Sequence, residues 1–469
     1  MFNHVTSIPT ELSSSQRTIH SYIIGQPGMG KSRALESWIM QDIAAGRGLA
    51  VIDPHGDLFR NLLLRLAKFP SIWKRLVIID PLDEKWTVGL NPLEARDEYD
   101  AERVALSLTD TITKIWKLDP TRTPRMLWLL NHAFLALADV GRTLIDLPPL
   151  LLNKEFREGL LPMVRNLRAK EYFAHEFPGI AWKVQEWVSP AMNRLGGLLF
   201  DKDVRPMIFS KNTLNFRRVI DEGLILLANL PKGLLGEGAS ALLGAFIVSR
   251  LQKAALSRAD NQNRPPFYLY LDEFQNYTTD NIQDVLSESR KYGLSLTLVN
   301  QYLDQLDSEI RSAVLNTAGT LACFRIGYQD AYRLAKEMYP APGEVQDEDM
   351  KVRPGRLGVL PFLNFWSNDQ EPKWHELAQR LTTLAAREFM VFRRGEIKPA
   401  KLRTFDMPDP IDSRQVGESV RRMKDTSGEL FASPKPEVHR DLEAHLAQIA
   451  LGFGGEGEPQ QSPDGFWEE

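Results

Sequence analysis

The sequence predicts an α/β fold: a mostly parallel, doubly wound sheet that an all-helical insertion interrupts. Short apolar runs alternate with helical patterns over residues 21–84 and again over residues 224–301, whereas residues 97–205 carry helical patterns only. Strands that alternate with helices form parallel sheets, and ligands of such sheets bind at the carboxyl ends of the strands. We therefore expect the functional residues where the apolar runs end.

The first apolar runs supply the strands of this sheet. SYIIG at residues 21–25 has the length of a buried strand, and GLAVID and RLVIID follow, each ending in Asp-Pro with a helical pattern over residues 58–69 between them. The polar residues behind these two runs are Asp53, His55, Asp57 and Asp80. They are either turn-forming residues or direct ligand contacts.

The stretch GQPGMGKS directly follows the first run and precedes a helical pattern over residues 33–46. In this order the glycines let backbone N–H groups point at phosphate oxygens, and the helix N-terminus adds its dipole. Lys31 would reach the terminal phosphates, and the Ser32 hydroxyl would ligate Mg²⁺. The predicted nucleotide-binding residues are Gly25, Gln26, Pro27, Gly28, Met29, Gly30, Lys31, Ser32 and Arg33.

A second signature lies at PFYLYLDEF, where an apolar run ends in two carboxylates. Charge beside a buried strand is unfavourable unless it has a function or a partner. We expect Asp272 to hold Mg²⁺ through water and Glu273 to activate the attacking water as general base. The next run, LSLTLVN, ends before Gln301, which is either a sensor of the terminal phosphate or a strand-end residue bonded to backbone.

Composition limits the remaining possibilities. The net charge is −4 and the isoelectric point is about 6.1, so any grip on nucleic acid must be local. Candidate cations are Arg165 and Arg168, expected three residues apart on one helix face, and Lys232; a solvated helix face is the alternative for the arginines. The single cysteine, Cys323, excludes internal disulfides and fits a buried core position.

Neither a run of 18 apolar residues nor a signal-peptide pattern occurs in the sequence, so we expect a cytoplasmic protein, at most peripheral to a membrane complex through its partners.

The C-terminal part predicts a hairpin that turns at Gly395, a linker over 408–415, a helix over 436–450 and an acidic tail. In that tail Phe466 and Trp467 either dock on a partner or remain solvated. The expected domains are 1–96 and 206–410 for the α/β unit, 97–205 for the insertion, and 411–469 for a helical extension and tail.

The chain resembles a known family. The run FYLYLDEFQNYTTDNIQDVLSESRKYGLSLTLVNQYLDQL, with VIDPHGDL, LNPLEARD and NTAGTLACFRIG, is similar to the cytoplasmic ATPase of type IV secretion coupling proteins, the TraG/TraD group of the HerA/FtsK superfamily. The resemblance covers residues 21–406 and implies a RecA-like P-loop ATPase, usually hexameric, that hydrolyses ATP with Mg²⁺ while it moves DNA. Typical members carry N-terminal membrane helices, whereas this sequence begins its sheet almost at once; the resemblance therefore implies the motor and does not by itself imply the secretion channel.

Ring motors of this kind complete each site with an arginine from the neighbouring subunit, which stabilises charge in the transition state. Arg325 stands among apolar residues in LACFRIG, so we expect it to need a buried partner: a neighbour's phosphate, or Asp330 of the same chain. Arg311 is the second candidate for the arginine from the neighbour.

Three functions follow from these observations. The first is an ATP-hydrolysing, hexameric DNA translocase or coupling ATPase of the conjugation or secretion type, with a relaxase or a secretion channel as possible partner. The second is a soluble HerA-like ring ATPase that serves a nuclease or effector. The third is a nucleotide-dependent scaffold that recruits protein substrates. Strong stimulation of ATP hydrolysis by DNA separates the two motors from the scaffold.

Overall fold

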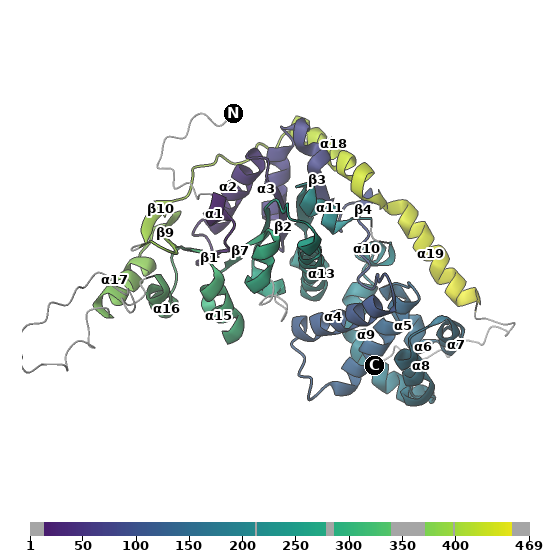
Figure 1. Ribbon diagram of the computed structural model, residues 1–469. Coiled ribbons are helices and arrows are strands. Elements are labelled where there is room, and N and C mark those ends of the chain that lie inside the picture. The colour runs from purple at the N-terminus through teal and green to yellow at the C-terminus, as the bar shows by residue number, and fades with distance from the viewer. Residues whose placement is uncertain (1–13, 212, 278–285, 339–370, 397–398, 453–469) are drawn as a thin grey trace, which may run out of the picture. The chain divides into compact units, whose positions relative to one another are not determined.

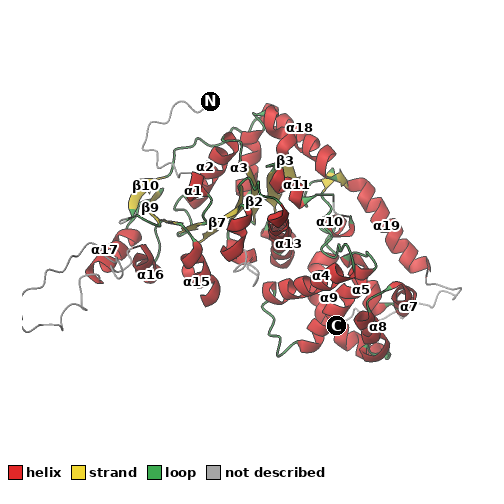
Figure 2. Cartoon of the chain, viewed as in Figure 1, coloured by secondary structure: helices red, strands yellow, loops and turns green. Residues whose placement is uncertain are grey.

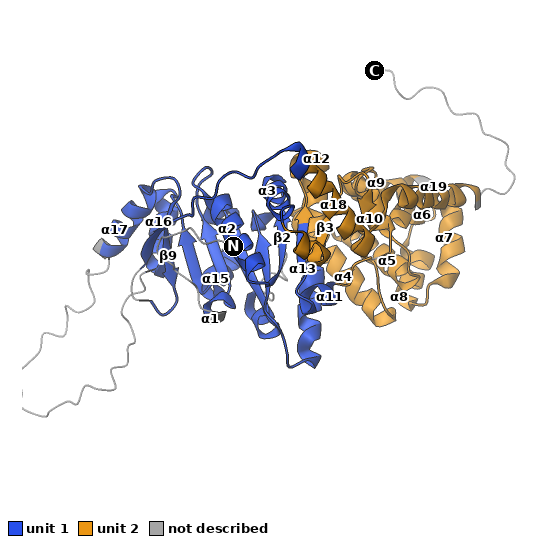
Figure 3. Ribbon diagram, turned by 90° about the horizontal axis from the view of Figure 1, so that it is seen from above, with its two compact units in different colours: residues 1–68, 216–227, 248–416 blue, residues 69–215, 228–247, 417–469 orange. Residues whose placement is uncertain are grey.

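The computed structural model describes residues 14–211, 213–277, 286–338, 371–396 and 399–452 (Figure 1). The chain forms two compact units, each assembled from segments that are separate in the sequence (Figure 3). Unit 1 comprises residues 1–68, 216–227 and 248–416, and unit 2 comprises residues 69–215, 228–247 and 417–469.

A nine-stranded sheet has the strand order β10-β9-β8-β1-β7-β6-β2-β5-β3. The strands are β1 (Ser21–Ile24), β2 (Gly48–Asp53), β3 (Leu76–Ile79), β5 (Ile225–Asn229), β6 (Phe267–Leu271), β7 (Leu294–Asn300), β8 (Thr320–Cys323), β9 (Glu388–Arg393) and β10 (Ala400–Arg403). β1 pairs in parallel with β7 and β8, and β6 with β2 and β7, while β9 pairs antiparallel with β8 and β10. The mostly parallel sheet predicted from the sequence is confirmed.

Helices cover the strands of unit 1. Every residue of β1, β2, β6 and β7 is buried, as expected for strands with helices over both faces. In Figure 1, α2 and α3 lie on one side of these strands and α15 on the other. The helices that lie wholly in this unit are α1 (Ser14–Arg17), α2 (Lys31–Ala44), α3 (Asp57–Leu66), α11 (Phe216–Asp221), α15 (Ser308–Thr317), α16 (Tyr328–Met338) and α17 (Glu371–Thr382).

Two local expectations for unit 1 are confirmed, and a third is tested only in part. The hairpin of β9 and β10 contains Gly395 at a φ of +92°, a left-handed conformation that glycine adopts easily. Cys323 is fully buried, and burial raises the pKa of its thiol. The stretch TTDNIQDVLSESRKYG at residues 278–293 has a helical pattern; its residues 278–285 lie outside the described part, residues 286–288 are helical, and Ser289–Tyr292 form a 3₁₀ turn.

Unit 2 contains the predicted all-helical insertion. The described residues between 98 and 209 form helices and no strand, as Figure 2 shows. These helices are α4 (Glu98–Ile115), α5 (Pro124–Asp139), α6 (Leu147–Leu152), α7 (Lys154–Leu160), α8 (Leu167–Glu171), α9 (Ala181–Leu199) and α10 (Arg205–Phe209). The short helix α12 (Lys232–Leu235) and the first part of α13 (Glu237–Leu256) also belong to this unit.

The C-terminal region contains one helix more than the sequence analysis identified. α19 (Lys435–Gly452) was expected, but α18 (Arg414–Phe431) begins inside the stretch predicted to be a linker. Lys424 of α18 donates to Asp80 and Asp83 at 3.0 Å each. Gly428 packs so closely on Trp86 that a Cβ there would come within 2.2 Å of the indole. These contacts hold α18 in unit 2, where β11 (Ser433–Pro434) pairs with β4 (Trp86–Thr87).

Within the part of the chain that the structure describes, one helical stretch, Glu237–Asp260, is long and apolar enough to cross a membrane by length and composition. Within its most apolar window 67% of the residues are buried inside the protein. The core helix of a soluble protein passes the same test, so this stretch is weak evidence for a membrane span.

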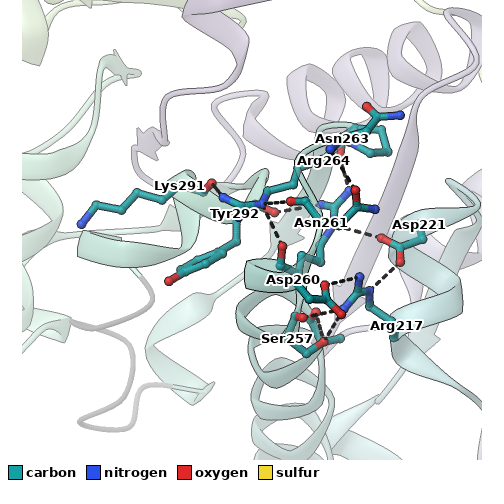
Figure 4. A network of polar contacts seen from close by, with 12 residues as sticks. Arg217, Asp221, Ser257, Asp260, Asn261, Asn263, Arg264, Lys291 and Tyr292 are labelled. Carbon is teal, nitrogen blue, oxygen red and sulfur yellow. Dashed lines mark hydrogen bonds and ion pairs between the residues drawn. The ribbon is translucent and has the colours of Figure 1, made fainter.

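A buried arginine organises the loops that lead into β6 and β7. Arg258 is completely buried, its guanidinium donates to the carbonyl oxygens of Tyr292 and Pro265 at 2.9 Å each, and its Nε lies 3.0 Å from an Asp221 carboxylate oxygen. Figure 4 shows the surrounding network, in which Asp221 also binds Arg217 at 2.5 Å. Arg258 therefore links the segments before β6 and β7 to helix α11.

We expect Arg258→Met to lower the free energy of unfolding by about 2 kcal/mol, because it leaves the carbonyl oxygens of Tyr292 and Pro265 without the donor that they share and leaves Asp221 with Arg217 as its remaining cation. Arg218→Met is the matched control: Arg218 is exposed and pairs with Glu222, which lies just beyond the end of α11, so the effect of its loss is expected to be much smaller. Urea unfolding of both variants measures the difference. Equal effects of the two substitutions would contradict a structural role for the buried cation.

Candidate nucleotide site

The site begins in the loop between β1 and α2. Gly28 and Gly30 adopt φ angles of +76° and +100°, which side-chain-bearing residues rarely adopt, so this loop shape depends on glycine. Lys31, the first residue of α2, turns back and donates to the carbonyl oxygen of Gly25 and, at 3.1 Å, to that of Gln26. The Lys31 side chain therefore lies across the loop whose shape depends on Gly28 and Gly30.

Packing explains the first glycine of the motif. A Cβ on Gly25 would lie 2.5 Å from the Cβ of Phe324, which follows β8. No side chain fits at that distance without a shift of backbone, so β8 and the loop can approach this closely only with glycine at this position. The solvent-exposed residues of the motif are Gln26, Pro27 and Gly28 in the loop and Ser32 in the first turn of α2.

Arg33 has partners of its own. Its guanidinium pairs with Asp409 and, at 3.3 Å, with the buried Glu36. The ion pairs hold the side chain on α2 and on the segment that follows β10. Of the nine residues predicted to bind the nucleotide, Arg33 is the one whose side chain is engaged in ion pairs.

The two carboxylates lie directly behind β6. Asp272 and Glu273 are buried, and the Glu273 backbone N–H donates to Asp272 Oδ1 at 3.1 Å. Glu273 has a φ of +48°, a left-handed conformation that is rare outside glycine. Such conformations persist where the surrounding structure imposes them, and they occur often at active sites.

Glu273 is held by two amides. Gln301, directly after β7, donates from Nε2 to Glu273 Oε1 at 2.9 Å, and Gln275 donates from Nε2 to Oε2 at 2.6 Å. Sequence reasoning identified Gln301 but missed Gln275, because its contact depends on the left-handed turn at Glu273. Each carboxylate oxygen of Glu273 therefore has its own donor.

Negative charge is concentrated here. Burial, then the charges of Asp53 and Glu273, raise the pKa of Asp272 to about 7. Burial lowers the pKa of Lys31, whereas Glu273 and Asp272 act to raise it. A divalent cation would relieve the repulsion among these carboxylates, so the donor set fits Mg²⁺ held by the Ser32 hydroxyl and, through water, by Asp272.

Asp53 has a turn-forming role as well as an electrostatic one. Its oxygens accept from the backbone N–H of His55 at 2.8 Å and of Phe59 at 2.9 Å, which fixes the entry into α3. The turn-forming interpretation of this residue is confirmed. His55 and Asp57 are exposed, and Asp80 lies in unit 2, where it accepts from Asn229 and Lys424.

Arg325, which was expected to need a buried partner, is not itself fully buried. It is half-buried, because the chain leaves the sheet after Cys323, and its carbonyl oxygen accepts from the Gln26 N–H at 2.8 Å. Asp330, its suggested partner within the chain, instead accepts from the Leu303 N–H at 3.0 Å. Arg311 donates to Asp304 at 3.0 Å.

The candidate cations for nucleic acid lie in unit 2. Arg165 and Arg168 are both exposed, but the expectation of one shared helix face is wrong: α8 begins at Leu167, after its cap Asn166. Arg165 precedes the helix and lies beside Asp139, whose carbonyl oxygen accepts from its guanidinium at 3.3 Å. Lys232 is the half-buried first residue of α12.

Comparison with known proteins places this fold and site in a family. The model of the type IV secretion-system coupling protein DNA-binding domain matches residues 3–317, more than half of the chain. The chain belongs to this family of coupling proteins. No match was found among curated proteins.

Solved structures of conjugative coupling proteins and of VirB4 have the same fold. The unbound bacterial conjugative coupling protein TrwBdeltaN70 is 17% identical, with 85% of this chain and 89% of that chain covered and a TM-score of 0.59. The plasmid coupling protein TrwB with ADP and Mg²⁺ is 16% identical, with 86% of this chain and 89% of that chain covered and a TM-score of 0.59. VirB4 of Thermoanaerobacter pseudethanolicus is 14% identical, with 85% of this chain and 92% of that chain covered and a TM-score of 0.53. These likenesses confirm the RecA-like P-loop fold that the resemblance implied.

The raised pKa of Asp272 predicts a pH-dependent stability. Between its ordinary value near 4 and about 7, the folded state binds a proton that the unfolded state has lost, so ionisation of Asp272 destabilises the fold increasingly as pH rises through this window. Asp272→Asn removes this contribution. Without ligands, we expect its stability relative to the original chain to increase by a few kcal/mol from pH 5 to pH 8 in urea unfolding. A difference that stays constant with pH would contradict the assignment.

Proposed function

We propose that this chain is an ATPase that binds ATP and Mg²⁺ at residues 25–33 and couples hydrolysis to the movement of DNA in conjugation or type IV secretion. The observation that carries the proposal is the buried Glu273 carboxylate, held by Gln301 beside Lys31 and Asp272. A general base, a contact for phosphate and a place for a metal come together at one edge of the sheet.

Each residue has a distinct role in this proposal. Backbone N–H groups of the loop and Lys31 hold the phosphates, while Ser32 and Asp272 hold the metal. Mg²⁺, when bound, neutralises charge on the phosphate oxygens. Glu273 accepts a proton from the attacking water, and Gln301 orients the carboxylate and senses the terminal phosphate.

The comparisons support the choice of ligands. TrwB structures hold ADP with Mg²⁺, a non-hydrolysable ATP analogue and the GTP analogue GDPNP. The family is defined by a DNA-binding domain, which supports DNA as the partner. With a net charge of −4, contact with DNA would rest on local cations, for which Arg165, Arg168 and Lys232 are candidates.

We propose a homohexamer for the assembly, located in the cytoplasm or at the periphery of a membrane complex through a relaxase or secretion-channel partner. In such a ring Arg325 is the first candidate for the arginine that acts on a neighbour's site. Its half-exposed side chain has no ion pair among the described residues. Arg311 is the second candidate.

The division of roles predicts different defects in two variants. Lys31→Ala is expected to abolish nucleotide binding, because it removes the cation that contacts the phosphates. Glu273→Gln is expected to bind ATP normally and to lower kcat at least about a hundredfold, because it removes the base and keeps the shape. Calorimetric binding of ATP and steady-state hydrolysis measure both. Equal loss of binding in the two variants would contradict Glu273 as the base.

Coupling to DNA predicts stimulated hydrolysis. DNA of any sequence is expected to raise the ATPase rate, and rising salt is expected to weaken the DNA affinity steeply, because binding to the phosphate backbone releases counterions. ATPase assays with unrelated DNA sequences at several salt concentrations test both expectations, with Glu273→Gln as the background control. Hydrolysis that does not respond to DNA would favour the protein-recruiting scaffold over the motor.

A further inference from the structure

A second wall of the nucleotide loop comes from the C-terminal part of unit 1. The Arg387 N–H, just before β9, donates to the Met29 carbonyl oxygen at 2.8 Å, and the Arg387 carbonyl oxygen accepts from the Thr404 N–H at 2.9 Å. A Cβ on Gly30 would lie 3.3 Å from both Cα and Cγ of Arg387. This arginine therefore lies directly against the loop.

The backbone of Arg387 is strained. Its φ is +69°, which is a rare conformation for a residue of this size. A left-handed non-glycine residue is less stable than glycine by roughly 1 kcal/mol or more, and it persists where its surroundings impose it. Because glycine would be more stable at this position, we expect the Arg387 side chain to have a function next to the loop.

The guanidinium has a weakly bound partner. It pairs with Asp406, but the Arg387 side chain is 44% exposed and that of Asp406 is 74% exposed. Surface ion pairs of this kind contribute at most about 1 kcal/mol. An anion held at the loop can therefore replace the carboxylate of Asp406 as partner.

Strand order indicates which part of a nucleotide Arg387 would contact. Glu273 and Gln301 follow β6 and β7, on one side of β1, whereas Arg387 precedes β9, on the other side beyond β8. A nucleotide whose terminal phosphate faces Glu273 extends its other end away from β6 and β7. That end passes the flank formed by β8 and β9.

We propose that Arg387 binds the α-phosphate end of the nucleotide, releasing Asp406 to donate its guanidinium N–H groups to phosphate oxygens. The inference rests on the proposed nucleotide function and adds a binding residue outside the loop motif. Because ATP and ADP share this end, Arg387 contributes equally to the affinity for both. It contributes to ground-state binding and not to kcat.

Three substitutions separate binding from folding. Arg387→Gly removes the guanidinium and relieves the strained backbone, Arg387→Lys keeps a charge, and Asp406→Asn releases the arginine from its partner. Lys117→Gly is the matched control: Lys117 is an exposed cation with a φ of +48°, and it lies in unit 2. Both glycine variants relieve strain and lose one positive charge, but only one of them changes the loop.

Calorimetric Kd values for Mg²⁺-ADP and for a non-hydrolysable ATP analogue, with kcat at saturating ATP, test the proposal. Arg387→Gly is expected to raise both Kd values about tenfold, which is the loss of one charge-assisted hydrogen bond, and to keep kcat within about twofold. Arg387→Lys is expected to restore part of the affinity. Asp406→Asn is expected to keep or tighten binding, whereas a structural role for the ion pair predicts a loss in both Arg387→Gly and Asp406→Asn.

Four outcomes would overturn the proposal: Kd values for Arg387→Gly within about twofold of the original chain, an equal loss in Lys117→Gly, an equal loss in Asp406→Asn, or a fall in kcat at unchanged Kd. If the unaltered chain binds no nucleotide, the proposed function and this inference fail together. If it binds and hydrolyses ATP while Arg387→Gly behaves like it, this inference fails alone.

Discussion

The parallel register around β1 is the constraint on which the site depends. Ile24, the last residue of β1, is paired with Asn300 of β7 and Cys323 of β8, and Leu271 of β6 is paired with Leu298 and Ile52. All these strands therefore end at the same edge, where Gly25, Asp272 and Gln301 directly follow β1, β6 and β7 and Asp53 ends β2. A shift of any strand by one residue would turn its side chains to the opposite face and separate the loop from its carboxylates.

Several features at this edge of the sheet are energetically unfavourable, namely buried like charges and left-handed backbone conformations. Buried carboxylates repel one another and raise the pKa of Asp272, while the ammonium group of Lys31 offsets part of the charge. Glu273 and Arg387 have left-handed backbone conformations, which direct their side chains differently from a strand or a helix. Local instability of this kind is common where binding of a ligand supplies the missing stabilisation.

Much of the fold could be predicted, because apolar runs reveal buried parallel strands and because the loop motif allows few alternatives. Gln301 could be predicted since it directly follows such a run. Gln275 and Arg387 could not, since their contacts depend on backbone angles and on a chain segment that returns to the loop from far along the sequence. α18 was missed because it is polar and contains two glycines. Arg325 was expected to need a buried partner because its neighbours in sequence are apolar, but β8 ends at Cys323, two residues before it, and its side chain is half-buried.

The strand order also has a consequence for biosynthesis. β1 is translated well before both of its neighbours in the sheet, since β7 begins at Leu294 and β8 at Thr320. Until then β1 has two unpaired edges, each a template for pairing with other chains. At about 5–20 residues per second this exposure lasts on the order of tens of seconds during translation. The nascent chain is therefore vulnerable to aggregation at the strand that leads into the nucleotide loop, and a holding chaperone would have the most effect there.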